Sequence, residues 1–163
     1  MANSSCLNKT LLTEHGYFLK DIKLPPLIGQ AVQSRDWEEL DRAIRVETLP
    51  GGSIFEELRK HEEFSEIEFI LSIRSSLEFP DEDGIWHDDG SRVLAFSLSL
   101  TLDPATIEGG ILEIRKRGDP KTSTIPTPLF GTMIVFATGQ KNFEHKINRV
   151  IRGERIIAAG WCT

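Results

Sequence analysis

The chain has 163 residues, with 19 Lys and Arg against 25 Asp and Glu, so its formal net charge is −6. This length suits one domain with a sizeable core, and the acidic balance disfavours nucleic-acid partners, which need clustered cations. No apolar run is long enough to span a membrane, and the first residues lack the charged and apolar regions of a signal peptide. We therefore expect a single domain over residues 1–163, with no nucleic-acid or membrane partner.

The chain has only two cysteines, Cys6 and Cys162, and they lie near opposite ends. Their spacing matches neither a metal site nor a disulfide framework. Free thiols are typical of a reducing compartment, so we predict a cytoplasmic location.

Residues 1–67 are predicted to form helices and short strands that support a sheet. Residues 1–12 are polar and are expected to be loose at the very end, and Tyr17 to Leu19 is predicted as a strand. A helix is expected from Leu27 to Gln33, with Pro26 near its first turn. The N-cap of a second helix is assigned to Asp36. The alternation from Arg45 to Leu49 predicts another strand.

A further helix is predicted from Ser53, as its cap, to about His61, and a strand from Ile67 to Ile73. From residue 68 to about 162 the pattern predicts short strands, as in a sandwich or barrel. Strands are expected at Gly131–Thr138, around His145 and at Arg155–Trp161. The polar segment from Lys116 to Pro128 is predicted as a loop.

The strand predicted from Arg92 to Leu102 has one bulky face and one small face, because strand side chains alternate. The bulky face carries Leu94, Phe96, Leu98, Leu100 and Leu102. The small face carries Val93, Ala95, Ser97, Ser99 and Thr101. We expect the small face to border a ligand cavity.

Three residues have the chemistry of a metal site. His87 and Asp89 are two positions apart, so on a strand both would point to the same side. A second imidazole, that of His145, would have to be brought close by a sheet that folds back. Two imidazoles and one carboxylate suit non-haem ferrous iron and leave positions for other ligands. Alone, His87 and Asp89 could instead form a surface ion pair. Asp88 is expected to point away, and Trp86 to lie in the core or at the rim.

These three residues belong to an ordered set of motifs. The set resembles that of the 2-oxoglutarate- and iron(II)-dependent dioxygenases, most closely the branch that contains the prolyl 4-hydroxylases. The resemblance covers about residues 68–162. The matching segments are, in chain order, His87-Asp88-Asp89, Arg92 to Leu100, Gly109-Gly110-Ile111-Leu112, Met133 to Phe136, His145-Lys146-Ile147, and Gly153-Glu154-Arg155 followed by Trp161.

This resemblance implies a mainly β fold, a double-stranded β-helix or jelly roll, backed by N-terminal helices. It implies Fe(II) held by His87, Asp89 and His145, with 2-oxoglutarate and O2 as cosubstrates, and it leaves a role for ascorbate open. Its reaction would hydroxylate an unactivated C–H and release succinate and carbon dioxide. By position, Arg155 would bind the far carboxylate of 2-oxoglutarate, and Ser99 would be the second donor.

The resemblance favours a hydroxylase of a protein residue or a free amino acid over other classes in the same superfamily. Related halogenases lack the carboxylate ligand, so Asp89 disfavours them. Nucleic-acid demethylases carry a second arginine six residues after the first, where this chain has Trp161. A small-molecule metabolite as substrate, or a catalytically silent jelly-roll binding module, stays open.

The prime substrate is not specified by any motif in the segments expected to shape its pocket, Phe79–Gly84 and Lys116–Pro128. Basic side chains at Lys146, Arg149 and Arg152 could favour an acidic substrate or could simply form a solvated rim.

Overall fold

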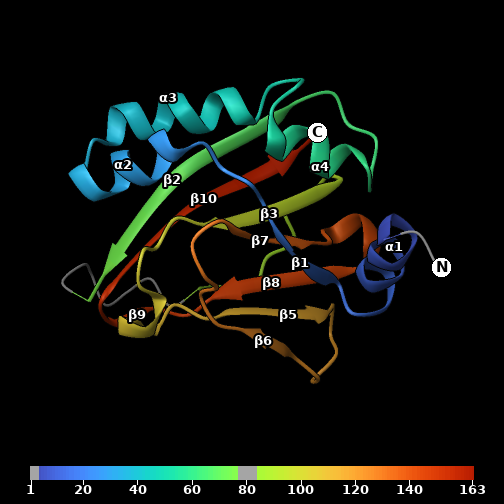
Figure 1. The fold of residues 1–163 in the computed structure, drawn as a ribbon. Coiled ribbons are helices and arrows are strands. Elements are labelled where there is room, and N and C mark those ends of the chain that lie inside the picture. Colours follow the sequence, from blue (N-terminus) through green and yellow to red (C-terminus); the bar gives the residue numbers. More distant parts are fainter. Residues whose placement is uncertain (1–3, 77–83) are drawn as a thin grey trace.

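The computed structural model describes residues 4–76 and 84–163, so the segment Phe79–Gly84, expected to shape the substrate pocket, lies outside the described residues except for Gly84. Two sheets face each other, and the larger carries two long helices, α2 and α3, on its side away from the smaller one (Figure 1). The helices are α1 (Ser4–Glu14), α2 (Pro26–Ser34), α3 (Trp37–Glu47) and α4 (Ser53–Arg59). The strands are β1 (Tyr17–Asp21), β2 (Ile67–Ser75), β3 (Leu94–Ser99), β4 (Glu108–Gly109), β5 (Leu112–Lys116), β6 (Ser123–Ile125), β7 (Thr132–Phe136), β8 (Phe143–Ile147), β9 (Val150–Arg152) and β10 (Glu154–Cys162).

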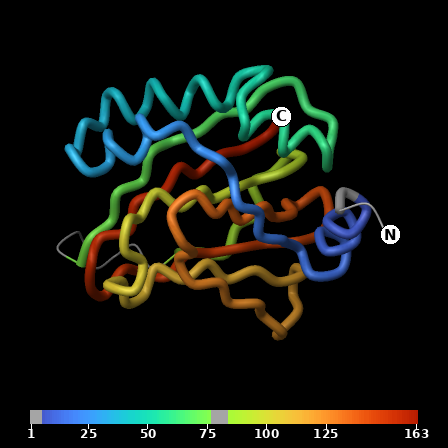
Figure 2. Tube along the Cα trace, viewed as in Figure 1, coloured from blue at the N-terminus to red at the C-terminus, as the bar shows by residue number. Residues whose placement is uncertain are grey.

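The larger sheet has the strand order β1-β7-β3-β10-β2, with antiparallel pairing throughout. The smaller sheet has the order β6-β5-β8, and an isolated bridge adds His87 beside β8. Strands distant in sequence are neighbours: β1 runs beside β7, and β10 lies between β3 and β2 (Figure 2). This is the predicted double-stranded β-helix, mainly β with supporting N-terminal helices.

Local signals in the N-terminal half explain the helices. The α2 helix begins at Pro26, and the Asp36 side chain caps α3 by accepting a hydrogen bond from the Glu39 amide at 3.0 Å, as predicted. Leu40 and Ile44 are fully buried one helical turn apart, which anchors α3 to the core. None of the described helices has the length and apolarity needed to cross a membrane.

Three predictions about elements were wrong. The strand predicted at Arg45–Leu49 is the end of α3, where Arg45 pairs with Asp41 one turn earlier at 2.9 Å. The cap of the fourth helix was predicted at Ser53, but Gly52 is the N-cap of α4 and Ser53 is its first helical residue. The loop predicted at Lys116–Pro128 contains β6, which pairs with β5.

Gly160 in β10 permits a close approach of the neighbouring strand. A Cβ added there would lie 2.3 Å from a ring carbon of Phe96 and 2.9 Å from the carbonyl oxygen of Glu68. We expect Gly160→Ala to lower the free energy of unfolding by about 1–3 kcal/mol, because the core must shift to accept the methyl group. Urea unfolding of the two proteins measures this difference.

Gly29 in α2 provides the matched control, since an added Cβ there would meet only Phe130 at an ordinary 3.8 Å. Gly29→Ala should raise the free energy of unfolding by about 0.5–1 kcal/mol through helix propensity. The same loss in both variants would contradict the packing explanation for Gly160.

Candidate active site

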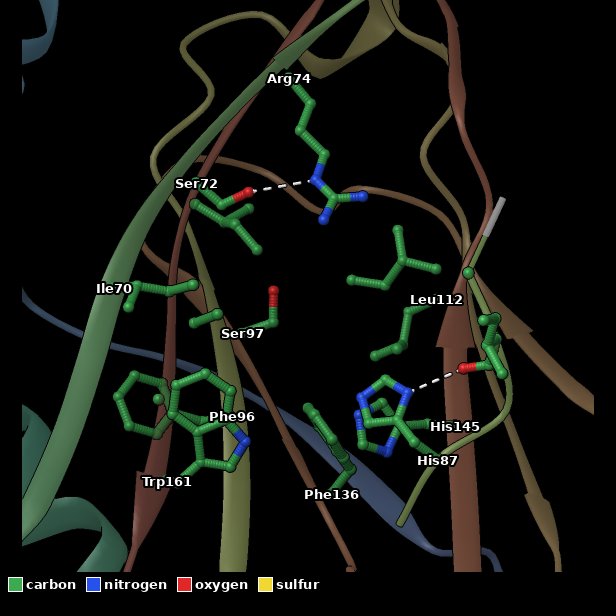
Figure 3. Close-up of a pocket in the computed structure, with 16 residues that line it drawn as sticks. Ile70, Ser72, Arg74, His87, Phe96, Ser97, Leu112, Phe136, His145 and Trp161 are labelled. Atoms are coloured by element: carbon green, nitrogen blue, oxygen red, sulfur yellow. Dashed lines mark hydrogen bonds between the residues drawn. The ribbon is translucent and has the colours of Figure 1, made fainter. Parts of the chain in front are cut away.

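A cavity of about 490 Å³ lies between the two sheets. The two histidines stand at one end and Arg74 at the other (Figure 3). Ser97, from the small face of β3, lines this cavity as expected. Phe96, from the bulky face, also borders it, next to Gly160, which has no side chain to cover the ring.

The histidines are held together by the backbone. The His87 amide donates to the His145 carbonyl at 3.0 Å, and the His145 amide donates back at 2.8 Å. Their ring centroids are 4.2 Å apart. The Nδ1 atom of His87 lies 2.8 Å from the Ile85 carbonyl oxygen, so a proton on Nδ1 can be donated there. That tautomer leaves Nε2 of His87 as a metal donor.

Asp89 reaches the histidines by a route that the strand argument did not predict. Its backbone is left-handed, with φ of 59°, and it lies outside any strand. Its carboxylate oxygens lie 3.6 Å from Nε2 of His87 and 3.4 Å from Nε2 of His145. The predicted juxtaposition is therefore present, although period-two alternation is not its cause. Aspartate is among the residues that tolerate this backbone region best.

The donor set fits a metal ion. One potential ligand atom from each of His87, Asp89 and His145 lies within 4.8 Å of the others. Within residues 4–76 and 84–163, the buried Oδ2 atom of Asp89 has no hydrogen-bond partner. Such an atom is costly to bury, and a cation would satisfy it. The mixture of two imidazoles and one carboxylate is the set expected for non-haem Fe(II).

Burial shifts the pKa values of His145 and Asp89. Burial, together with the charge of His87, lowers the pKa of His145 to about 3, so this imidazole is neutral at ordinary pH. Neutral imidazole is the form that binds a metal. Burial also raises the pKa of Asp89 above its ordinary value, and a hydrogen bond from Trp161 and the charges of His87 and Arg92 offset part of that rise.

The side chains next to His87 and Asp89 in the sequence, those of Trp86 and Asp88, contact other groups. The Asp88 carboxylate forms an ion pair with Arg117 and accepts a hydrogen bond from the Gly90 amide at 2.9 Å. Trp86 is half-buried, with the Arg115 guanidinium 3.9 Å and the Lys146 ammonium 4.9 Å from its ring centroid. Trp86 is thus packed between two cations at the rim.

Arg155 is buried, not a surface arginine, with 1% of its surface exposed. Its Nε donates to Thr127 Oγ1 at 3.2 Å, and its Nη1 has no hydrogen-bond partner within the described part of the chain. Gly110 makes room for it, since an added Cβ there would lie 2.7 Å from Cδ of Arg155. Burial and the charge of Arg74 lower the pKa of Arg155 to about 10, so it is still a cation at neutral pH.

Ser99 is fully buried, and its hydroxyl donates to the Pro128 carbonyl at 2.8 Å. A role as donor to a cosubstrate would require that proton to leave Pro128. The assignment of Ser99 as second donor stays a prediction.

Sequence reasoning missed Arg74. On β2, the side chains of Ile70, Ser72 and Arg74 all line the cavity, because they alternate with outward-facing neighbours. The strand was predicted only as far as Ile73, one residue too short to include this arginine. The alternation from Ile70 could have found it.

The description "2OG-Fe(II) oxygenase superfamily" is that of the family model that matches residues 56–163, more than half of the chain. The chain belongs to this superfamily, whose members use Fe(II), 2-oxoglutarate and O2. Comparison with curated protein sequences gives no match.

Solved structures with the same fold include prolyl hydroxylases. A Pseudomonas putida prolyl-4-hydroxylase is 18% identical, with a TM-score of 0.63, and the match covers 99% of this chain and 92% of that one. A Trichoplax adhaerens prolyl hydroxylase, solved with a peptide fragment of hypoxia inducible factor, is 10% identical, with a TM-score of 0.68 over 97% and 88% of the two chains. HygX from Streptomyces hygroscopicus, solved with nickel and 2-oxoglutarate, is 10% identical, with a TM-score of 0.58 over 96% and 85%.

Proposed function

We propose that this protein is a hydroxylase in which His87, Asp89 and His145 hold Fe(II) and Arg155 binds the far carboxylate of 2-oxoglutarate. The observation that carries the proposal is the cluster of three donors within 4.8 Å of one another, beside a cavity between the two sheets. The buried Arg155, with an unpartnered Nη1 among the described residues, supports the cosubstrate assignment. An intact set of these groups disfavours a silent binding module.

Bound iron and 2-oxoglutarate would supply the oxidation: one O2 is consumed, a C–H becomes C–OH, and 2-oxoglutarate becomes succinate and carbon dioxide. The protein would contribute binding, orientation and exclusion of water. Phe136 packs edge-on against the His145 ring, with centroids 4.7 Å apart, and so fixes the plane of this imidazole. Ser97 and Ile157, from the larger sheet, form part of the cavity wall.

The mouth of the cavity favours a substrate that presents an aliphatic group. Ile70 and Ile85 line the cavity and are 54% and 84% exposed, and Trp161 also lines it. Such apolar surface suits a prolyl or other aliphatic side chain of a protein or peptide, or an amino acid. The likeness to a prolyl hydroxylase solved with a peptide supports a peptide substrate. A small metabolite with an aliphatic C–H, which the same apolar lining would accept, is the second candidate.

The basic side chains noted in the sequence do not form one patch with Arg155. Lys146 lies 3.5 Å from the carboxylate of Glu113, and Arg152 lies 3.8 Å from that of Glu108. These pairings give no support to the hypothesis of an acidic substrate.

We also propose the cytoplasm as compartment, because Cys6 and Cys162 are both free thiols.

The proposed function is tested by succinate release from 2-oxoglutarate with Fe(II) and O2, in the presence of proline-containing peptides and free amino acids. Products are screened for the mass of one added oxygen atom. Succinate formation with a matching hydroxylated product supports the proposal. Absence of succinate from protein that retains iron and 2-oxoglutarate would support the silent module instead.

A separate prediction distinguishes hydroxylation from halogenation. With Asp89 as a ligand, no protein position is left vacant for chloride, so the native protein should form no chlorinated product even in high chloride. Asp89→Ala should lose hydroxylation, because one of three ligands is gone. Mass spectrometry of the products checks both statements, and chlorination by the native protein would overturn the ligand assignment.

A further inference from the structure

Two arginines face each other across the antiparallel pair of β2 and β10. Arg74 is the register partner of Arg155, as Ser72 is of Ile157 and Ile70 is of Ala159. Residues directly opposite in such a pair point to the same side, with Cβ atoms about 4.5–5.5 Å apart. The side chains of Ile70, Ser72 and Arg74 line the cavity, so this side is the cavity side.

Like charges placed opposite each other destabilise a sheet. The charge of Arg74 contributes, after burial, to the lowered pKa of Arg155. Arg155 is almost fully buried, and its Nη1 has no hydrogen-bond partner among residues 4–76 and 84–163. An anion between the two guanidinium groups would relieve both the repulsion and the missing hydrogen bond.

Arg74 reaches into the cavity from the end opposite the histidines (Figure 3). Its Nε donates to the Ser72 hydroxyl at 3.3 Å, which directs the guanidinium across the cavity. A dicarboxylate with one end near His87 and His145 would extend its other carboxylate toward this end. The cavity thus offers metal ligands at one end and a cation at the other, which suits an acid with a carboxylate at each end.

Three hydroxyl groups lie around this end of the cavity. Thr127 accepts a hydrogen bond from Nε of Arg155, Ser72 accepts one from Nε of Arg74, and the Ser99 hydroxyl donates to the Pro128 carbonyl at 2.8 Å. Among the described lining residues at this end, the partly exposed Arg74 is the charged donor, and it could add a charge-assisted hydrogen bond to those from Arg155.

We propose that Arg74 binds the far carboxylate of 2-oxoglutarate together with Arg155, as a two-arginine clamp that selects 2-oxo acids with a second carboxylate. This inference rests on the proposed function, since it takes the cosubstrate to lie between the histidines and Arg155. Arg74 is then a specificity-determining residue for the cosubstrate, and it contributes nothing to holding the 2-oxo end.

The test compares two ligands, 2-oxoglutarate and 2-oxopentanoate, which has the same chain length but a methyl group in place of the far carboxylate. Each is titrated anaerobically into iron-loaded protein and followed by the visible charge-transfer band of the iron–2-oxo acid complex. Arg74→Gln should bind 2-oxoglutarate about tenfold or more weakly, as expected for a lost charge-assisted contact. Its affinity for 2-oxopentanoate should stay within about threefold of wild type.

Two further variants keep the result interpretable. Arg74→Lys keeps the charge without the planar fork and should fall between wild type and Arg74→Gln. Arg42→Gln, on the surface of α3 and paired with Glu39 at 2.8 Å, is the matched control and should change neither affinity. Thermal melting with and without 2-oxoglutarate gives a second readout, in which Arg74→Gln should show a smaller ligand-induced rise in Tm.

An unchanged 2-oxoglutarate affinity in Arg74→Gln, or an equal loss for both ligands, would overturn the clamp. If wild-type protein binds iron but no 2-oxoglutarate, the proposed function fails as well. If wild type binds 2-oxoglutarate and Arg74→Gln binds it equally, only the clamp fails.

Discussion

His145→Ala is expected to bind ferrous iron at least about a hundredfold more weakly than wild type, since even changes around a metal's ligands cost about 10–100-fold in affinity. Two donors would be left, and Asp89 and His87 alone hold a labile ion poorly. Iron per chain after desalting, measured by metal analysis, gives the result directly. Succinate release should be lost in parallel.

Because His145 is buried, its replacement also disturbs the packing around it. His87→Ala is therefore the second ligand variant, since it should affect the stability of the fold less. The His87 side chain is 54% exposed, and its loss should leave the melting temperature nearly unchanged while iron is lost. The control is His15→Ala, whose side chain is 60% exposed and lies on the loop after α1. Iron content near the wild-type level in both ligand variants would rule out this metal site.

Arg155→Lys is expected to weaken 2-oxoglutarate binding by roughly tenfold or more, because the charge stays but the planar fork that meets a carboxylate in two hydrogen bonds is lost. Iron affinity without cosubstrate should change little, since Arg155 is not a ligand. Anaerobic titration of 2-oxoglutarate into iron-loaded protein measures the first quantity, and metal analysis measures the second.

The matched control is Arg152→Lys, an exposed arginine three residues earlier on β9, which should change neither quantity. Unchanged cosubstrate affinity in both Arg155→Lys and Arg155→Ala would mean that another residue holds the carboxylate. Arg74, its partner across the sheet, would then be the first candidate.

The pattern of short strands predicts a sandwich or barrel, and the resemblance to the dioxygenase family implies the jelly roll. The H-x-D spacing and a distant histidine indicate the cluster of metal donors, which requires a sheet that folds back. The manner of joining was not predictable, because Asp89 adopts a left-handed backbone and the two histidines are bridged by backbone hydrogen bonds. Such details depend on the long-range pairing of chain segments, which local patterns do not specify.

The features that the sequence did not predict have the same physical origin, which is long-range pairing and packing of the chain. Alternation at Arg45–Leu49 predicts a strand, but Arg45 to Glu47 continue α3, whose Leu40 and Ile44 are buried in the hydrophobic core. The role of Ser99 stays a prediction, and the hydrogen bond from its hydroxyl to the Pro128 carbonyl at 2.8 Å joins segments that are distant in the sequence. Arg74 became visible as a site residue only once β2 was placed beside β10.

The measurement that tests the central claim most directly is the absorbance spectrum of wild-type protein mixed anaerobically with Fe(II) and 2-oxoglutarate. We expect a visible charge-transfer band that appears only when Fe(II) and 2-oxoglutarate are both present. It should saturate at one Fe(II) and one 2-oxoglutarate per chain, and it should be absent in His145→Ala. No band in wild-type protein that holds iron, or an undiminished band in His145→Ala, would contradict the assignment of this cavity as the site of iron and 2-oxoglutarate.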